Sequence, residues 1–254
     1  PQDVTASAWN NNGTLVAVGY GDGTLEIWDN LGNLVQTLGG HTSSVEAIAW
    51  NATDSRLAAA SSDLSVQMWD TTINPWQGIG VSFDGREYIR DLTWFGTRMF
   101  GVAADDADSR TFWEWDEQGS MIRSQSLPQG SGDQIAIQPP DGLKIAIGTL
   151  DAIYILDSQT LSIDETIDTS SLDGNETIIE LVWSSNGTKL LSGHLSGYLR
   201  LFNMSLVPHS QEFEVLGTNT PATVRGIYWT DTVLDISFGL NENTVVAIGA
   251  DGTL

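Results

Sequence analysis

One fourteen-residue pattern recurs along this chain, and an internal repeat constrains the possible folds more than any other feature of a sequence. Residues 16–29 read VAVGYGDGTLEIWD. Five further copies, two of them ungapped and three looser or shortened, lie at residues 57–70, 190–203, 100–116, 145–157 and 245–254. A chain built in this way stacks similar units whose core continues from each unit to the next.

The spacing of the copies predicts what each unit is. An apolar stretch precedes each copy, and from Trp9 to Trp50 is 41 residues, from Trp50 to Trp94 is 44, and from Trp94 to Ile137 is 43. A period of about 40–45 residues is typical of four-stranded propeller blades. Residues 15–20 and 25–29 read as short strands separated by Gly-Asp-Gly-Thr, which is hairpin-turn chemistry. Many strands are apolar at consecutive positions, as expected where neighbouring sheets cover both faces.

We therefore expect an all-β chain, a β-propeller of four-stranded antiparallel blades with five full blades and a partial sixth. The blades are predicted within one domain, 1–254, at approximately 4–44, 45–88, 89–132, 133–176, 177–232 and 233–254. In the irregular fifth unit we favour 224–229 over 212–216 as the outer strand, because only three residues then separate it from the next strand. An open ring leaves unpaired edges, so we expect a fragment, incomplete at both ends, of a six-, seven- or eight-bladed propeller, and we favour seven.

The chain resembles the WD-repeat β-propeller family through the pairs Trp28-Asp29, Trp69-Asp70 and Trp115-Asp116. The second unit is the best match, with Gly40-His41 before its first strand. The resemblance implies a hydrogen-bonded structural network that ties a loop, a turn and two strands together, made by His41, Ser61, Asp63 and Trp69. In the first unit Tyr20 takes the serine position, and in the fifth His194 takes it while Ser196 replaces the aspartate.

Composition excludes several classes of partner. The chain has 10 Lys+Arg against 33 Asp+Glu, and its net charge of −23 repels nucleic-acid phosphates and anionic lipids. Its 41% apolar content and 10 Trp residues are enough for a folded core, so the acidity does not indicate disorder. No apolar run is long enough for a membrane-spanning helix, so we expect no membrane insertion in this segment.

Catalytic and metal-site signatures are missing from the sequence. It has no cysteine, three histidines, no His-Glu-x-x-His pair, no phosphate-binding lysine loop and no Gly-x-Ser-x-Gly motif. The acidic run Asp105-Asp106-Ala107-Asp108 lacks the glycine and distal glutamate of a calcium loop, so we interpret it as a solvated turn. We expect no catalytic residue, no cofactor and no metal site.

The predicted function is protein or peptide binding by a non-enzymatic scaffold, as the family resemblance also implies. The binding face is expected where the turns between second and third strands meet the loops before first strands. Its candidate residues are Tyr20, Asp22, Glu87, Arg90, Arg110 and His194. Arg90 and Arg110 are rare positive charges suited to holding a carboxylate of the partner. The alternative is a propeller enzyme, or a small-ligand or sugar-binding propeller, with its site in the central channel.

Five Asn-x-Ser/Thr sequons leave the compartment open. They lie at Asn12, Asn51, Asn175, Asn186 and Asn203. A secreted protein could carry glycans there, but Asn-Gly-Thr at Asn12 and Asn186 is also hairpin-turn chemistry. The acidic composition suits either an extracytoplasmic protein or one from a saline environment.

Overall fold

Every regular element among the described residues is a β-strand. The computed structural model describes residues 3–81, 83, 88–104, 110–128, 134–150, 152–169, 177–194, 199–205, 233–238 and 245–249. The chain divides into two compact units, Pro1–Gln129 and Gly130–Leu254. Across the part of the chain that is described, no helix is long and apolar enough to span a membrane.

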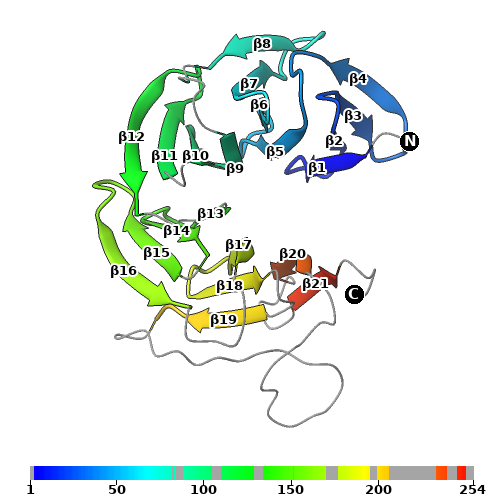
Figure 1. The fold of residues 1–254 in the computed structure, drawn as a ribbon. Helices are drawn as coiled ribbons and strands as arrows, with labels where there is room; N and C mark the ends of the chain where they lie inside the picture. The colour runs from blue at the N-terminus through cyan, green and yellow to red at the C-terminus, as the bar shows by residue number, and fades with distance from the viewer. Residues whose placement is uncertain are drawn as a thin grey trace. The chain divides into compact units, whose positions relative to one another are not determined.

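The first unit contains three antiparallel sheets of four strands, in each of which chain neighbours are also sheet neighbours. In Figure 1 the three sheets stand side by side, with β1, β5 and β9 as inner strands and β4, β8 and β12 as outer strands. Their strands are β1 (Val4–Trp9), β2 (Leu15–Tyr20), β3 (Leu25–Asp29), β4 (Leu34–Leu38), β5 (Val45–Trp50), β6 (Arg56–Ser61), β7 (Ser65–Asp70), β8 (Gln77–Gly80), β9 (Tyr88–Phe95), β10 (Arg98–Ala104), β11 (Arg110–Asp116) and β12 (Met121–Leu127).

The second unit repeats this pattern with one four-stranded sheet, a described three-stranded sheet and a described two-stranded sheet. The strands are β13 (Gln134–Ile137), β14 (Lys144–Gly148), β15 (Ala152–Asp157), β16 (Ile163–Asp168), β17 (Ile178–Trp183), β18 (Lys189–His194), β19 (Leu199–Asn203), β20 (Val233–Phe238) and β21 (Val245–Gly249). Both alternatives for the outer strand of the fifth blade, 212–216 and 224–229, lie outside the described residues.

Strand β6 shows why these strands are apolar at consecutive positions. Leu57, Ala58, Ala59 and Ala60 are all 0% exposed. Leu57 and Ala59 pack in a cluster shared with the first sheet, whereas Ala58 and Ala60 pack in a cluster shared with the third. Because successive side chains of a strand point to opposite faces, both faces of the middle sheet are buried. The prediction of stacked four-stranded blades is confirmed.

The aspartate of each Trp-Asp pair caps the turn that follows the third strand. An Asp29 oxygen accepts hydrogen bonds from the amides of Leu31 and Asn33 at 3.0 and 2.8 Å. Asp70 accepts the amide of Thr72, and Asp116 accepts those of Gln118 and Ser120. Such turns use aspartate because its short side chain reaches the backbone two residues on. The recurring aspartate is therefore a structural residue of each hairpin.

Candidate functional site

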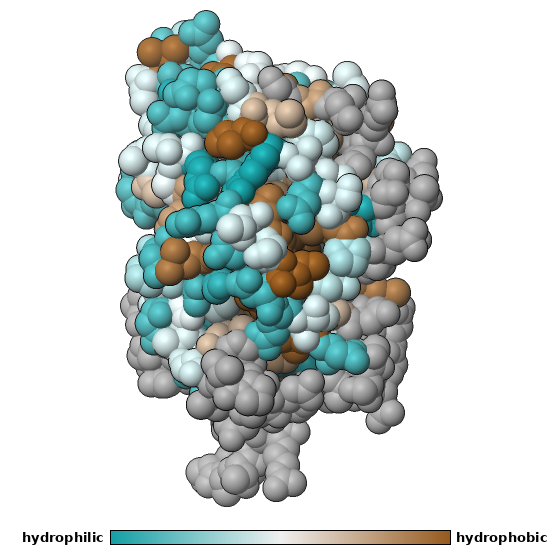
Figure 2. Space-filling view, turned by 90° about the vertical axis from the view of Figure 1, so that its left-hand side faces the viewer, coloured by the Kyte–Doolittle hydropathy of each residue, from teal (hydrophilic) through white to brown (hydrophobic). Residues whose placement is uncertain are grey.

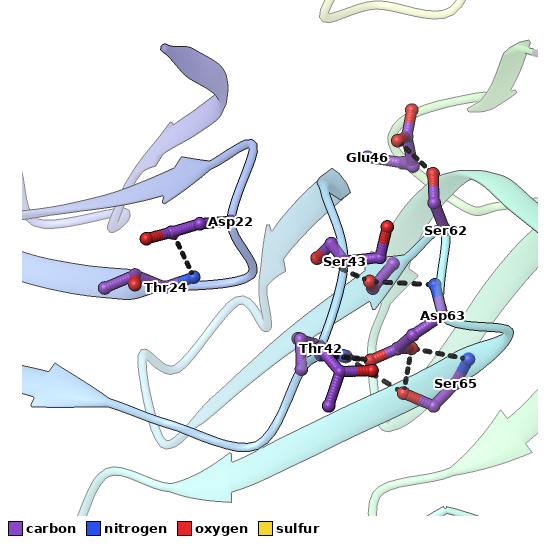
Figure 3. Close-up of polar contacts among 10 residues, drawn as sticks. Asp22, Thr24, Thr42, Ser43, Glu46, Ser62, Asp63 and Ser65 are labelled. Carbon is purple, nitrogen blue, oxygen red and sulfur yellow. Dashed lines mark hydrogen bonds and ion pairs between the residues drawn. The ribbon is translucent and has the colours of Figure 1, made fainter. Parts of the chain in front are cut away.

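The turn between β6 and β7 contains a polar network centred on Asp63 (Figure 3). The Asp63 carboxylate accepts the Thr42 amide at 2.7 Å and the Ser65 amide at 3.0 Å. It also accepts the Ser65 hydroxyl and lies 3.3 Å from Nδ1 of His41. One carboxylate thus joins the loop before β5 to the start of β7.

Burial and hydrogen bonding set the charge states of this pair. Burial lowers the pKa of His41, against the opposing effect of the nearby Asp63 carboxylate. Burial acts to raise the pKa of Asp63, but hydrogen bonds from Ser65, the Thr42 amide and His41 outweigh it, so the pKa is lowered. The arrangement favours a neutral His41 beside an ionised Asp63.

Ser61 contacts this network through hydrogen bonds, and Trp69 contacts it through the ring of His41. The Ser61 hydroxyl donates to the Ser43 carbonyl at 2.9 Å and accepts the Asp63 amide at 3.1 Å. Trp69 presents its ring to His41 edge-on, with centroids 6.4 Å apart. Nε2 of His41 is buried and has no hydrogen-bond partner among the described residues. Ser61 therefore ties the turn to the loop through Ser43 rather than through the histidine ring.

In the first blade, Tyr20 and Asp22 at the matching turn have other hydrogen-bond partners than Ser61 and Asp63 have in the second blade. The Tyr20 hydroxyl donates to Oε2 of Glu26 at 2.8 Å, and this hydrogen bond is the main cause of a raised Tyr20 pKa. Asp22 is exposed and accepts the Thr24 amide at 2.9 Å. Gly23 has a φ of 88°, and a Cβ there would lie 2.7 Å from the His41 carbonyl oxygen. The turn between β2 and β3 therefore lies against the loop that precedes β5, and only glycine fits there.

Arg90 and Arg110, the positive charges predicted for the binding face, lie in the third blade. Arg90 is exposed, with its guanidinium carbon 5.6 Å from the ring centroid of Tyr88. Ala104 of β10 pairs with Tyr88 on one side and with the half-buried Arg110 on the other, so these residues share one end of the sheet. No carboxylate forms an ion pair with Arg90 among the described residues, whereas Arg56, Arg98, Arg123 and Lys144 each have one. Glu87 lies outside the described residues.

His194, a candidate residue of the predicted binding face, is buried. It is 0% exposed, and its Nε2 lies 2.8 Å from the Ser192 hydroxyl. Strand β18 continues through His194, which pairs with Ile178 of β17. The residue is therefore part of a central strand in the second unit rather than of a surface turn.

Exposed apolar side chains and acidic residues do not by themselves add a second candidate site. Exposed apolar residues occur on outer strands, for example Leu34 and Val35 of β4 and Met121 and Ile122 of β12. On the face drawn in Figure 2, apolar residues form small separate groups among hydrophilic ones. Scattered exposure of this kind is normal. In the described ranges no three His, Asp or Glu side chains are grouped to hold a metal ion, and Asp105, Asp106 and Asp108 lie outside those ranges.

Comparisons with known protein families and solved structures agree with the architecture of four-stranded blades. A family model described as "WD domain, G-beta repeat" matches residues 1–29 and 32–70. The matched segments are WD repeats, and the chain has the fold of WD40-repeat β-propellers. Propellers of this family commonly mediate protein binding and are usually non-catalytic.

Human relatives match this WD40 propeller only over a short segment. The F-box-like/WD repeat-containing protein TBL1X of Homo sapiens is 50% identical over 46 residues, which are 18% of this chain and 8% of the relative. The human protein TBL1Y is 48% identical over 46 residues, which are 18% of this chain and 9% of that protein. The matched segment thus spans less than a tenth of either relative.

Solved structures share the fold of this WD40 propeller over nearly the whole chain. A chain in a crystal structure of the mitotic checkpoint complex superposes with a TM-score of 0.74 at 17% identity, covering 99% of this chain and 73% of that one. The β-propeller domain of Cps50 (Swd1) from Myceliophteria thermophila gives 0.71 at 18% identity, covering 98% of this chain and 80% of that one.

Proposed function

We propose that this WD40 propeller is a non-catalytic interaction module that holds a protein or peptide segment at the end of the sheets where Tyr88, Arg90 and Arg110 lie. The observation that carries the proposal is Arg90, an exposed cation packed against Tyr88 and without an ion-pair partner among the described residues. A tyrosine face fixes a guanidinium and leaves its N–H groups available to a ligand.

The chemistry of Arg90 points to a carboxylate on the partner. A guanidinium pairs with a carboxylate through two parallel hydrogen bonds, which gives orientation as well as affinity. The net charge of −23 nevertheless repels a strongly acidic partner at long range. A neutral or basic segment that carries one carboxylate, such as a chain terminus, fits both conditions.

The proposal is tested by a pull-down with the full-length protein, followed by a titration of the recovered partner. The double variant Arg90→Glu/Arg110→Glu should bind at least about tenfold more weakly, which corresponds to about 1.4 kcal/mol. The control Lys144→Glu/Lys189→Glu changes the net charge equally at a distant sequence position in the second unit and should retain binding. Equal affinities for the two double variants would contradict the assignment of this face.

A further inference from the structure

The outer strands of the first unit lack the acidic residues that are frequent in the rest of the chain. No Asp or Glu, and only one Lys or Arg, occurs in the segments that contain β4, β8 and β12, which are residues 30–45, 71–83 and 118–132. The whole chain has 33 Asp+Glu. In the second unit, by contrast, the outer strand β16 contains Asp164, Glu165 and Asp168. These outer strands therefore differ in charge although they occupy the same place in their blades.

β4 and β16 have the same register against the third strand of their blades. Each contains one bulge, which leaves Val35 unpaired in β4 and Asp164 unpaired in β16. The residue after the bulge is Gln36 in β4 and Glu165 in β16. The matched positions thus hold neutral side chains in the first blade and carboxylates in the fourth.

β4 presents an open sheet edge (Figure 1). It pairs with β3 and with no other described strand, so one row of its main-chain N–H and C=O groups faces away from the sheet. Its first two residues, Leu34 and Val35, are 48% and 53% exposed. Proteins usually protect such edges from pairing with charged side chains or proline, and β4 contains neither.

The other outer strands each have a feature that opposes pairing with a further strand. β8 has only four residues, and two of them are glycine. β12 contains Arg123 and is followed directly by Pro128. β16 has its three carboxylates. Among the described outer strands, β4 is therefore the one that is open to strand addition.

We propose that the edge of β4 binds an extended segment of a partner protein as a fifth strand of the first blade, and that this segment has β-branched residues flanked by lysine or arginine. In strand addition, main-chain hydrogen bonds supply the affinity and side chains supply the specificity. The uncharged edge lets the segment pair without burying a charge, and the net charge of −23 attracts basic flanks. A second copy of this chain is disfavoured, because it carries the same net charge.

This inference does not rest on the proposed ligand-binding face. That face is formed by Tyr88, Arg90 and Arg110 of the third blade, whereas β4 is the outer strand of the first blade. The two surfaces can therefore be tested with separate variants.

Hydrogen exchange of the full-length protein with the synthetic peptide KKTVTVTVKK tests the proposal. The threonines and valines of the peptide favour a strand, and its lysines supply the basic flanks. We expect saturating peptide to slow amide exchange in residues 34–38 at least about threefold, because the outward-facing amides gain acceptors. Exchange in residues 163–168, which form β16, should not change.

Two further peptides separate main-chain pairing from charge attraction. The same peptide with N-methyl groups on alternate residues keeps its charge but loses main-chain donors, so it should not protect β4. A peptide with glutamates in place of the lysines should bind more weakly than the original.

The variant Val35→Asp/Gln36→Glu gives β4 the residues that β16 has at the same register, where the fold accepts them. It should bind the lysine-flanked peptide at least about tenfold more weakly than the wild-type protein does. The control Gln118→Glu/Gln159→Glu adds the same charge at two exposed turn residues and should retain binding. Arg90→Glu/Arg110→Glu should also retain it.

Three results would overturn the proposal. Unchanged exchange in residues 34–38, or equal protection by the N-methylated peptide, would show that β4 does not pair with an added strand. Equal loss of binding in Val35→Asp/Gln36→Glu and in the glutamine control would assign binding to net charge alone. A wild-type dimer in sedimentation that becomes a monomer in Val35→Asp/Gln36→Glu would assign the edge to a second copy instead.

Discussion

At the scale of single residues, Asp63 holds the turn between β6 and β7 against the loop that precedes β5. Its carboxylate accepts two backbone amides and one hydroxyl and contacts His41, whereas Asp22 occupies the same turn position in the first blade without a preceding Gly-His loop. Ser65 and the side chain of Asp63 are partly buried, so removal of the carboxylate leaves some of these hydrogen bonds without a full replacement by water.

Asp63→Ala should therefore lower the free energy of unfolding by about 1–3 kcal/mol, because the Thr42 and Ser65 donors lose their hydrogen-bond acceptor. Asp22→Ala, at the matched turn, should cost clearly less. Urea melts of the two variants measure the difference through their midpoints. Ser196, which aligns with Asp63 in the fifth blade, lies outside the described residues, and we expect Ser196→Ala to cost less as well. Equal midpoint shifts for Asp63→Ala and Asp22→Ala would show that the network around Asp63 adds nothing to stability.

The same residues predict how stability depends on pH. The pKa of His41 is lowered from its ordinary value of about 6.5, so the unfolded chain binds more protons than the folded one below that pH. Stability is fully present above about pH 6.5 and falls as the pH drops toward the folded pKa. The lowered pKa values of Asp29, Asp70 and Asp157, caused by hydrogen bonds from their turns, add a further loss below about pH 3.9.

Urea midpoints measured between pH 8 and pH 3 check this expectation. Wild type should lose stability in two ranges, one beginning near pH 6.5 and one near pH 3.9. His41→Gln should lose only the lower one. A wild-type midpoint that stays constant from pH 7 to pH 5 would contradict the assignment of the upper range to His41.

At the scale of elements, the third blade differs from its neighbours through a buried charge. Glu114 of β11 is 1% exposed and forms ion pairs with Arg98 of β10 and Arg123 of β12. The residue before the tryptophan of the second blade is Met68, which is also buried. Three strands are thus joined by an ionic contact where the second blade has an apolar side chain.

Removing both cations should leave the buried Glu114 carboxylate without a counter-charge. The double variant Arg98→Met/Arg123→Met is expected to lose about 3–5 kcal/mol of unfolding free energy, because Glu114 stays buried without a counter-charge. Adding Glu114→Met should recover most of that loss. Equilibrium unfolding of the double and triple variants provides the comparison, and a triple variant no more stable than the double one would show that the charge is not the cause.

The sequence predicted these elements better than their side-chain contacts. The first hairpin has strands at 15–20 and 25–29 as expected, because Gly-Asp-Gly-Thr marks its turn and the copies fix its length. The first strand of the third blade, Tyr88–Phe95, begins one residue before the predicted start of that blade at 89.

The contacts that were not predicted depend on distant partners. The roles of Thr42 and Ser65 in binding Asp63 require loops to meet, although Asp-x-Ser was a usable turn signal. The burial of His194 depends on its pairing with Ile178, which a local alignment does not contain. The Tyr20–Glu26 bond likewise crosses from one strand to the next.

At the scale of the whole molecule, the single domain predicted for 1–254 remains to be tested against the division into two compact units. We expect one cooperative unfolding transition, because each repeat in a stack shares core residues with its neighbouring repeats. Fluorine labels on Trp113 in the first unit and Trp183 in the second should report the same urea midpoint. Separate midpoints would show that the units unfold independently.

Hydrogen bonds from tryptophan side chains to a neighbouring blade have a consequence for how this repeat can diverge. Trp50 and Trp183 bind the carbonyl oxygens of Ala8 and Ala136, and every amino acid has that oxygen. The acceptor position therefore tolerates substitution as far as this bond is concerned, whereas the donor side varies along the chain: Phe238 stands at this position in β20, and Nε1 of Trp94 in β9 has no hydrogen-bond partner among the described residues. Blades can therefore differ in sequence at the acceptor side of such a junction and still form this bond, which leaves room for neighbouring repeats to diverge.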